Sequence, residues 1–191
     1  MRIIAGDLKG RHIKAVPGKE TRPTSDKIKE AIFHKIGPYF SNGNCLDVFA
    51  GSGSLGIEAI SRGMDKVVFI EKGKQAVQTI RHNLQQLSIQ AQCDVYHMDA
   101  FRALELLAKK QNQYDLILID PPYEKVSYEK TLQCIQANDL LKDMGKVYIE
   151  YGPSKPIMYD SEYFSLSYEK KYSNITAVMI LEKSSNGDRG K

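Results

Sequence analysis

Four consecutive residues, Asp120-Pro121-Pro122-Tyr123, follow an apolar strand-like run and could hold an amine. Because proline fixes φ and lacks an N–H group, two prolines in succession stiffen the backbone and hold the Pro121 carbonyl in one direction. Asp120 and that carbonyl then form two hydrogen-bond acceptors that suit an NH₂ group, and Tyr123 offers a flat face on which a base can stack. The alternative is an ordinary turn at a strand end with an exposed tyrosine.

The chemistry that this tetrad favours is transfer of a group to the exocyclic amine of a nucleobase. Such an amine is a weak nucleophile because its lone pair is delocalised into the ring. Acceptors for both N–H groups favour a pyramidal nitrogen, and fixed oxygens stabilise the positive charge that grows on nitrogen during attack. We therefore predict a catalytic site formed by Asp120, Pro121, Pro122 and Tyr123.

A glycine-rich loop follows the first long strand-like run and could hold a nucleoside cofactor. Gly51, Gly53 and Gly56 match G-x-G-x-x-G, in which glycines allow a sharp turn and a close approach of the backbone to a ligand. Glu71 stands 20 positions after Gly51, where a carboxylate can accept hydrogen bonds from both hydroxyls of an adenosine ribose. This pattern by itself fits both NAD and S-adenosylmethionine (SAM).

Two further acidic residues favour SAM. Asp47 lies inside the strand before the loop, where a buried carboxylate is costly unless it is paired, and the methionine end of SAM offers an ammonium that NAD lacks. Asp99 follows a later strand and can accept the amine of adenine, a role compatible with capping the helix that begins at Phe101. We predict SAM as the cofactor. The cofactor residues that we expect are Asp47, Gly51, Gly53, Gly56, Glu71, Asp99 and Ala100.

An alternation of apolar strands and amphipathic helices would position these residues. It predicts strands at 44–50, 66–71, 93–98, 114–120 and 145–151, and helices at 55–62, 76–87, 101–110 and 127–141. Near-continuous apolar strands indicate a parallel sheet covered on both faces by helices. Because ligands of such sheets bind at the carboxyl ends of the strands, the glycine loop, the acidic residues and the tetrad should share one edge.

The two ends of the chain depart from this alternation. We expect a small N-terminal β-hairpin with strands Ile3–Ala5 and His12–Val16, and then a helix capped within 24–26, with apolar residues from Ile28 to Tyr39. Two strand-like runs around 172–174 predict a C-terminal antiparallel hairpin. The predicted fold is α/β and Rossmann-like, with a mostly parallel seven-stranded sheet. Its predicted parts are a basic extension (1–20), a SAM-dependent methyltransferase domain (21–183) and a disordered tail (184–191).

The distribution of charge points to a nucleic acid. Residues 1–36 carry nine Lys or Arg and four Asp or Glu, whereas the chain as a whole has a net charge of only +4. A local basic surface is expected of a nucleic-acid binder, although a solvated lysine-rich face is the alternative. Our candidates for contacts with RNA phosphates are Arg2, Lys9, Arg11 and Lys14.

Other compositional features exclude several classes of protein. Three cysteines without a C-x-x-C motif, and four histidines without ligand spacing, argue against a disulfide scaffold and a metal site. No run approaches the ~20 apolar residues that span a bilayer, and the N-terminus lacks the apolar run of a signal peptide. We therefore expect a cytoplasmic protein without a metal or a membrane partner.

The stretches RIIAGDLKGRHI (2–13), RPTSDKIKEAIF (22–33) and LDVFAGSGSLGIEAISRG (46–63), followed by DPPY (120–123), resemble the RsmD family of bacterial 16S rRNA guanine-N2 methyltransferases. These are class I SAM-dependent enzymes, and the resemblance runs to about Tyr151. It implies SAM as donor, no metal, and one guanine of 16S rRNA as acceptor within a partly assembled small ribosomal subunit. It also brings Arg22 and Thr24 near the active site as RNA contacts, where the alternative is a loop arginine and a helix cap.

Three other functions compete with this interpretation. A DNA adenine-N6 methyltransferase uses a similar tetrad, but 191 residues leave little room for the usual target-recognition insertion. A protein glutamine methyltransferase normally begins its tetrad with asparagine and needs no basic extension. A non-catalytic RNA-binding assembly factor that retains the fold would not bind SAM.

Overall fold

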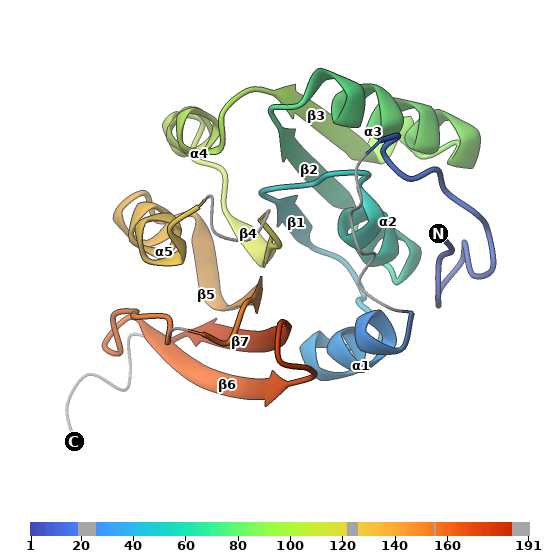
Figure 1. Cartoon of the computed structure of the whole chain (residues 1–191). Helices are drawn as coiled ribbons and strands as arrows, with labels where there is room; N and C mark the ends of the chain where they lie inside the picture. Colours follow the sequence, from blue (N-terminus) through green and yellow to red (C-terminus); the bar gives the residue numbers. More distant parts are fainter. Residues whose placement is uncertain (19–25, 122–125, 155, 185–191) are drawn as a thin grey trace.

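The computed structural model describes residues 1–18, 26–121, 126–154 and 156–184. These ranges form a central sheet with helices on both faces (Figure 1). The elements are α1 (Asp26–Ile36), β1 (Asn44–Asp47), α2 (Ser54–Ser61), β2 (Lys66–Glu71), α3 (Lys74–Leu87), β3 (Cys93–His97), α4 (Ala100–Lys109), β4 (Tyr114–Ile119), α5 (Tyr128–Ala137), β5 (Leu141–Tyr151), β6 (Phe164–Lys171) and β7 (Ala177–Lys183).

The sheet has seven strands in the order β3-β2-β1-β4-β5-β7-β6. Neighbouring strands from β3 to β5 are parallel, whereas β7 is antiparallel to both β5 and β6. The carboxyl ends of β1 to β5 therefore lie along one edge, which we call the carboxyl edge. Because β6 runs in the same direction as β5, its last residue and the turn from β6 to β7 also lie there.

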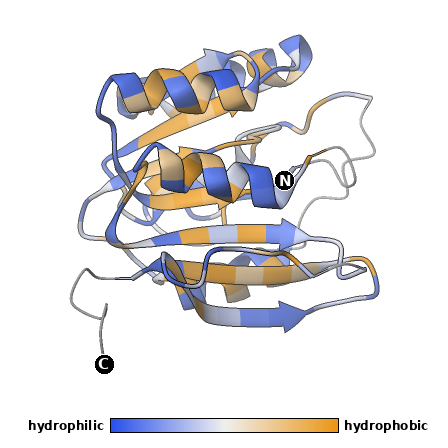
Figure 2. Cartoon of the chain, turned by 90° about the vertical axis from the view of Figure 1, so that its left-hand side faces the viewer, coloured by the Kyte–Doolittle hydropathy of each residue, from blue (hydrophilic) through white to orange (hydrophobic). Residues whose placement is uncertain are grey.

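The sheet is covered by α1, α2 and α3 on one face and by α4 and α5 on the other (Figure 1). The central strands are buried on both faces, which explains why their sequences are almost continuously apolar. Figure 2 shows apolar residues concentrated in the inner strands, whereas the edge strand β6 is mostly hydrophilic. No helix in the described ranges is long and apolar enough to span a bilayer.

The alternation of strands and helices and the C-terminal hairpin are confirmed, with shifts at some boundaries. The helix predicted at 127–141 ends at Ala137, because Asp139 adopts a left-handed conformation (φ 47°) and Leu141 already belongs to β5. Helix α1 ends at Ile36, before Gly37 and a proline. Tyr39 therefore does not extend the apolar face of α1, and it is 66% exposed.

The N-terminal strands are shorter than we predicted. Arg2 and His12 form an isolated antiparallel bridge, and the predicted strands Ile3–Ala5 and His12–Val16 do not develop. The reason is that the N–H groups of Ile4 and Ala5 donate to the side chain of Glu58 (2.9 and 3.0 Å) instead of to a partner strand.

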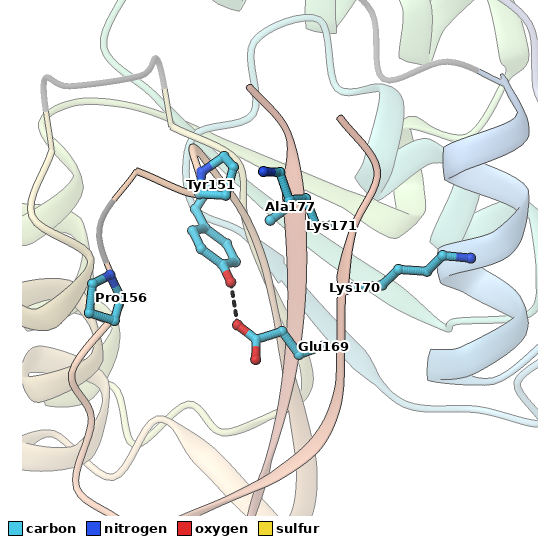
Figure 3. A pocket seen from close by; sticks show the side chains of 7 residues that line it. Tyr151, Pro156, Glu169, Lys170, Lys171 and Ala177 are labelled. Carbon is cyan, nitrogen blue, oxygen red and sulfur yellow. Dashed lines mark hydrogen bonds between the residues drawn. The ribbon is translucent and has the colours of Figure 1, made fainter. Parts of the chain in front are cut away.

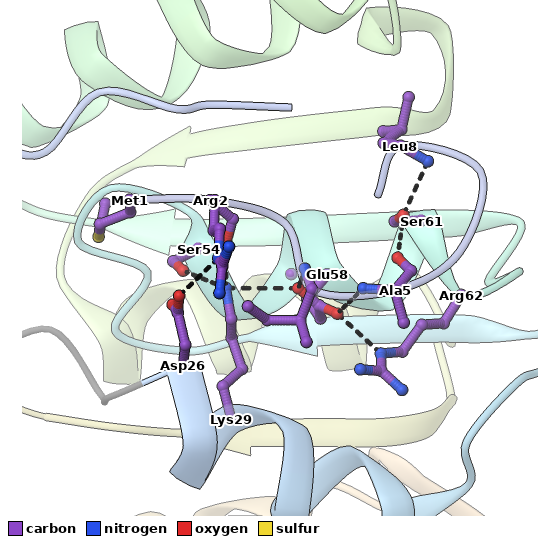
Figure 4. Close-up of polar contacts among 12 residues, drawn as sticks. Met1, Arg2, Ala5, Leu8, Asp26, Lys29, Ser54, Glu58, Ser61 and Arg62 are labelled. Carbon is purple, nitrogen blue, oxygen red and sulfur yellow. Dashed lines mark hydrogen bonds and ion pairs between the residues drawn. The ribbon is translucent and has the colours of Figure 1, made fainter. Parts of the chain in front are cut away.

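The first sixteen residues, which we call the N-terminal segment, are instead fixed to α2 and α3. Glu58 of α2 is fully buried and also pairs with Arg62 (2.8 Å) and Lys29 (3.3 Å) (Figure 4). On α3, the buried Asn83 accepts a hydrogen bond from the N–H of Lys14 (2.8 Å) and donates one to its carbonyl (3.0 Å). The boundary that we predicted at residue 20 lies outside the described residues, as does nearly all of the predicted tail.

Candidate active site

The glycine loop connects β1 to α2 at the carboxyl edge. Gly51 (φ 56°) and Gly53 (φ 81°) adopt left-handed conformations, and a Cβ atom at Gly51 would meet no atom within 4 Å. Gly56 lies in the first turn of α2, where a Cβ atom would come within 2.4 Å of the Phe69 ring. Gly51 and Gly53 therefore make the turn, with open space beside Gly51, and Gly56 allows α2 to pack closely on β2, as in nucleoside-binding loops.

Glu71, at the end of β2, is held by the backbone of this loop. One carboxylate oxygen accepts a hydrogen bond from the N–H of Gly51 (3.0 Å), and the other accepts one from the N–H of Gly73 (2.6 Å). Each carboxylate oxygen can accept more than one hydrogen bond. The side chain is therefore fixed beside the glycine loop while it keeps capacity for two hydroxyl donors. Its predicted contact with ribose stays a prediction.

Asp47 is a buried carboxyl group at the end of β1. It is 2% exposed and accepts a hydrogen bond from the N–H of Gly56 (3.1 Å). Burial raises the pKa of Asp47 to about 7; the Gly56 hydrogen bond opposes this shift, and the charge of Glu71 adds to it. A carboxyl group in such surroundings is stabilised as an anion when a cation comes close. The position therefore fits the ammonium group of a ligand.

Asp99 is the N-cap of α4, as the sequence allowed. Its side chain accepts hydrogen bonds from the N–H groups of Phe101 (3.0 Å) and Arg102 (3.4 Å). Both bonds go to the same carboxylate oxygen, and the side chain is exposed. Ala100, the first residue of the helix, is buried. The predicted contact of Asp99 and Ala100 with adenine is compatible with this geometry and stays a prediction.

Asp120 directly follows β4 and lies one position beyond the pairing of Ile119 with Ile149 of β5. Burial is the main cause that raises the pKa of Asp120 well above its ordinary value, and the charges of Glu150 and Asp47 raise it further. Pro121, the next residue, is buried. Four of our predicted site residues lie outside the described residues: Arg22, Thr24, Pro122 and Tyr123.

The sequence analysis did not identify Glu150 of β5. This carboxyl group is buried, 6% exposed, and accepts a hydrogen bond from the hydroxyl of Tyr148 (3.0 Å). Its signal in the sequence is a single charge within the apolar run Val147–Tyr151. Strand pairing places it beside Asp120, which is the reason that its charge raises the Asp120 pKa.

Four carboxyl groups therefore lie on one face of the sheet near the carboxyl edge, with Asp47 two positions further from the edge than the other three. The register pairs Asp47 with Phe69 of β2 and with Leu118 of β4, and Leu118 with Tyr148 of β5. Side chains two positions apart in a strand share a face. The carboxylate row, in the order of the strands, consists of Glu71, Asp47, Asp120 and Glu150.

The four predicted phosphate contacts of the N-terminal segment are exposed, but two of them have protein partners. Arg2 forms an ion pair with Asp26 (2.7 Å), and Arg11 donates to the carbonyl of Gln86 (2.9 Å). Lys14 lies near the glycine loop, because the same Asn83 amide that donates to its carbonyl also donates to the carbonyl of Ser52 (3.0 Å). The contacts with phosphate, including that of Lys9, stay predictions.

A metal site was not expected, and within the described ranges no group of three or more His, Cys, Asp or Glu side chains could hold a metal ion. The carboxylate row does not converge on one point, since its members stand on four successive strands. The end of the row with Glu71 and Asp47 is suited to an elongated cationic ligand, and the end with Asp120 is suited to an amine.

Comparisons with known proteins place this geometry in context. A family model described as "Conserved hypothetical protein 95" matches residues 1–181. The chain is 45% identical over 151 residues to YlbH of Bacillus subtilis, a candidate rRNA methyltransferase, covering 79% of this chain and 82% of that protein. It is 37% identical over 161 residues to ribosomal RNA small subunit methyltransferase D of Haemophilus influenzae, covering 83% and 82%.

A solved structure also resembles the whole chain. It is that of yhhF from Escherichia coli, assigned as a methyltransferase, with a TM-score of 0.83 and 30% identity over 97% of this chain and 99% of that one. The match of the family model includes the glycine loop, the carboxylate row and the N-terminal segment.

Proposed function

Because the chain belongs to the conserved hypothetical protein 95 family, the family of ribosomal RNA small subunit methyltransferase D, it is a methyltransferase, and we propose that it methylates the N2 amine of a guanine in 16S rRNA. SAM is the methyl donor in this proposal. The observation that carries it is the carboxylate row, which joins a nucleoside-binding loop to an amine-binding position along one edge of the sheet.

The cofactor half of the row fits SAM group by group. Asp47 is a buried carboxyl group behind the glycine loop, so it could pair with the ammonium group of SAM bound at that loop. Glu71 is fixed where two ribose hydroxyls could donate to it. Gly51 leaves open space for the ligand at the turn. Asp99 caps α4 through one oxygen, so that the other can accept the amine of adenine. Bound there, SAM supplies a methyl group on a positively charged sulfur.

The acceptor half of the row provides for the guanine. Asp120 and the carbonyl of Pro121 would each accept one N–H of the N2 amine, and Tyr123 would stack on the base. As nitrogen attacks, the N–C bond forms and the S–C bond breaks, and one proton must leave the amine. Asp120 in its ionised form could receive it, and burial and the neighbouring charge of Glu150, which raise its pKa, make it a stronger base than an exposed carboxylate.

The substrate that we propose is 16S rRNA within a partly assembled small subunit. Support comes from the names of the relatives and from the excess of basic residues in the N-terminal segment. Arg2, Lys9, Arg11 and Lys14 would meet phosphates, which position the complex without reading the sequence. Arg22 and Thr24 would act closer to the target. The cytoplasmic location stays part of the proposal.

The test is methyl transfer from labelled SAM to defined acceptors, followed by mapping of the modified nucleoside. We expect label in N2-methylguanosine when the purified protein is given 16S rRNA or small-subunit particles from cells that lack the enzyme. Duplex DNA and a glutamine-containing peptide are the comparison acceptors. Label in adenine, in DNA or in protein would replace the proposal with the corresponding rival, and absence of SAM binding would favour a non-catalytic assembly factor.

A further inference from the structure

A hollow of about 490 Å³ lies at the end of β5, outside the carboxylate row (Figure 3). Tyr151 of β5 and Pro153 and Pro156 of the following loop form an apolar part of its wall. Glu169 and Lys171 of β6 contribute charge. The hydroxyl of Tyr151 donates a hydrogen bond to Glu169, so that these two side chains are fixed relative to each other. The proposed function assigns no role to this hollow.

The hollow lies near the proposed acceptor site along the carboxyl edge, but on the other face of the sheet, because Tyr151 directly follows Glu150 and successive side chains of a strand point to opposite faces. Ile119 of β4 pairs with Ile149 of β5, so Asp120 and Tyr151 stand one and two positions beyond that pair. Tyr151 pairs with Ala177 of β7, and Ala177 pairs with Lys171 of β6. Adjacent strands are about 5 Å apart, so the row from β4 to β6 spans roughly 15 Å. An RNA strand whose guanine reaches Asp120 could therefore reach the hollow by crossing this part of the edge.

The lining has the chemistry of a nucleotide site. An aromatic ring and two prolines suit the flat faces of a base, and sites for small ligands combine such walls with a few polar groups. Glu169 retains acceptor capacity beyond the Tyr151 hydroxyl and could accept an N–H of a base. Lys170 and Lys171 are exposed, and because they are adjacent in β6 their side chains point to opposite faces of the sheet, Lys171 to the face of the hollow and Lys170 away from it (Figure 3). Each is a cation that suits phosphate. Lys170 also lies 5.2 Å from the centre of the Tyr172 ring.

We propose that this hollow binds a nucleotide that flanks the methylated guanine, with its base against Tyr151 and the prolines, its own phosphate at Lys171, and the next phosphate, where the strand crosses the edge, at Lys170. The base is one that presents an N–H donor to Glu169. This inference rests on the proposed function and adds a determinant of sequence context to it. The basic residues of the N-terminal segment and those of β6 would then hold the RNA on two sides of the target.

The first test removes the two cations. In the double variant Lys170→Ala, Lys171→Ala, the slope of log affinity for 16S rRNA against log salt should flatten by about 1.4 units, since each phosphate contact on a single strand contributes about 0.7. The matched control is Lys66→Ala, Lys109→Ala. Lys66 begins β2 and Lys109 ends α4, so both lie at the opposite edge of the sheet, and both are exposed. The control should keep the wild-type slope.

The second test concerns the base. Glu169→Gln keeps the size of the side chain and removes its charge. We expect the KM for 16S rRNA to rise roughly tenfold with kcat little changed, because a hydrogen bond to a charged group is lost outside the reacting atoms. SAM titration should be unchanged in every variant, which verifies folding and the cofactor site independently.

The outcomes separate this inference from the function on which it rests. If wild-type protein methylates rRNA and both sets of β6 variants behave like the control, the hollow has no role in RNA binding and the inference is wrong. If the double variant binds free rRNA normally and loses only assembled particles, the surface meets a ribosomal protein, which also overturns it. If wild-type protein binds rRNA with the expected dependence on Lys170 and Lys171 but methylates another acceptor, the proposed function fails and the nucleotide site stands.

Discussion

The two halves of the carboxyl edge hold their carboxyl groups in different ways. In the cofactor half, formed by β3, β2 and β1, backbone N–H groups of nearby loops and of the first turns of α2 and α4 hold Asp47, Glu71 and Asp99. In the acceptor half, formed by β4, β5, β7 and β6, Asp120 lies beside a second buried carboxyl group, Glu150, on the neighbouring strand. Local backbone geometry therefore positions the carboxyl groups of the cofactor half, whereas strand pairing positions those of the acceptor half.

This difference has a consequence for ionisation. Backbone donors stabilise a carboxylate before any ligand arrives. A neighbouring carboxylate, in contrast, disfavours the charge of Asp120, so whether Asp120 holds a proton depends on which charged groups lie close to it. Glu71 and Asp99 are therefore preorganised, whereas Asp47 and Asp120 should respond to the arrival of a cationic ligand or of the target amine.

The largest expected effect is on turnover, through Asp120. Asp120→Asn should lose at least ~10²-fold in kcat, because one of two acceptors for the amine becomes neutral and can no longer take the proton. Its affinity for SAM should stay near the wild-type value. Methyl transfer to 16S rRNA measures the first quantity and calorimetry the second. Asp94→Asn, at an exposed position of β3, is the control. Near-wild-type turnover in Asp120→Asn would remove it from the catalytic site.

The next effect is on SAM affinity, through Glu71. Glu71→Ala should weaken SAM binding by at least about tenfold, since a hydrogen bond to a charged group contributes roughly 1.5–3 kcal/mol. Turnover at saturating SAM should change less than in the Asp120 variant, which separates the two halves. Because Glu71 also holds Gly51 and Gly73, thermal unfolding must accompany the titration. A folded variant with unchanged affinity would contradict the ribose contact.

A third prediction concerns pH and Asp47. The pKa of Asp47 is raised to about 7 in the folded, ligand-free protein, whereas it keeps its ordinary value of about 4 in the unfolded chain. Between these two pH values the folded protein holds a proton on Asp47 that the unfolded chain has lost. The contribution of Asp47 to the stability of the fold therefore decreases as pH rises from about 4 to 7. An ammonium ligand favours the anion. SAM affinity should therefore increase up to tenfold per pH unit between about 5.5 and 7 and then level off.

Calorimetry in two buffers of different ionisation enthalpy should detect the proton released on SAM binding below pH 7. Asp47→Asn should bind SAM more weakly and lose this pH dependence. An unchanged pH dependence in the variant would assign it to another group.

The smallest expected effect concerns the N-terminal segment. Replacing Arg2, Lys9, Arg11 and Lys14 together by alanine should flatten the salt dependence of RNA binding, with about 0.7–0.9 units for each true phosphate contact. Since Arg2 already pairs with Asp26 and Arg11 with a carbonyl, we expect a change of about 1–2 units, comparable with that of the β6 double variant. SAM titration is the control for folding. An unchanged slope would mean that the N-terminal segment makes no phosphate contacts, and the lysines of β6 would then be the main cationic contacts with the RNA.

Much of the cofactor half could be predicted from the sequence, because its signals are local. The glycine spacing, the acid 20 positions later and the N-cap at Asp99 are each encoded within a short stretch, and each has a direct backbone consequence. The alternation of apolar strands and amphipathic helices likewise reflects periods of two and 3.6 residues. The C-terminal hairpin follows from two apolar runs without a helix between them.

Tertiary structure decided the rest. Glu150 is 30 positions from Asp120, and only the order of the strands makes them neighbours. Strands Ile3–Ala5 and His12–Val16 were expected to pair, but buried side chains of α2 and α3 compete for their backbone groups through Glu58 and Asn83. The hollow at Tyr151 exists because β6 returns beside β7. Local patterns fix elements and loops, whereas contacts between distant segments depend on which surfaces those elements bury against one another.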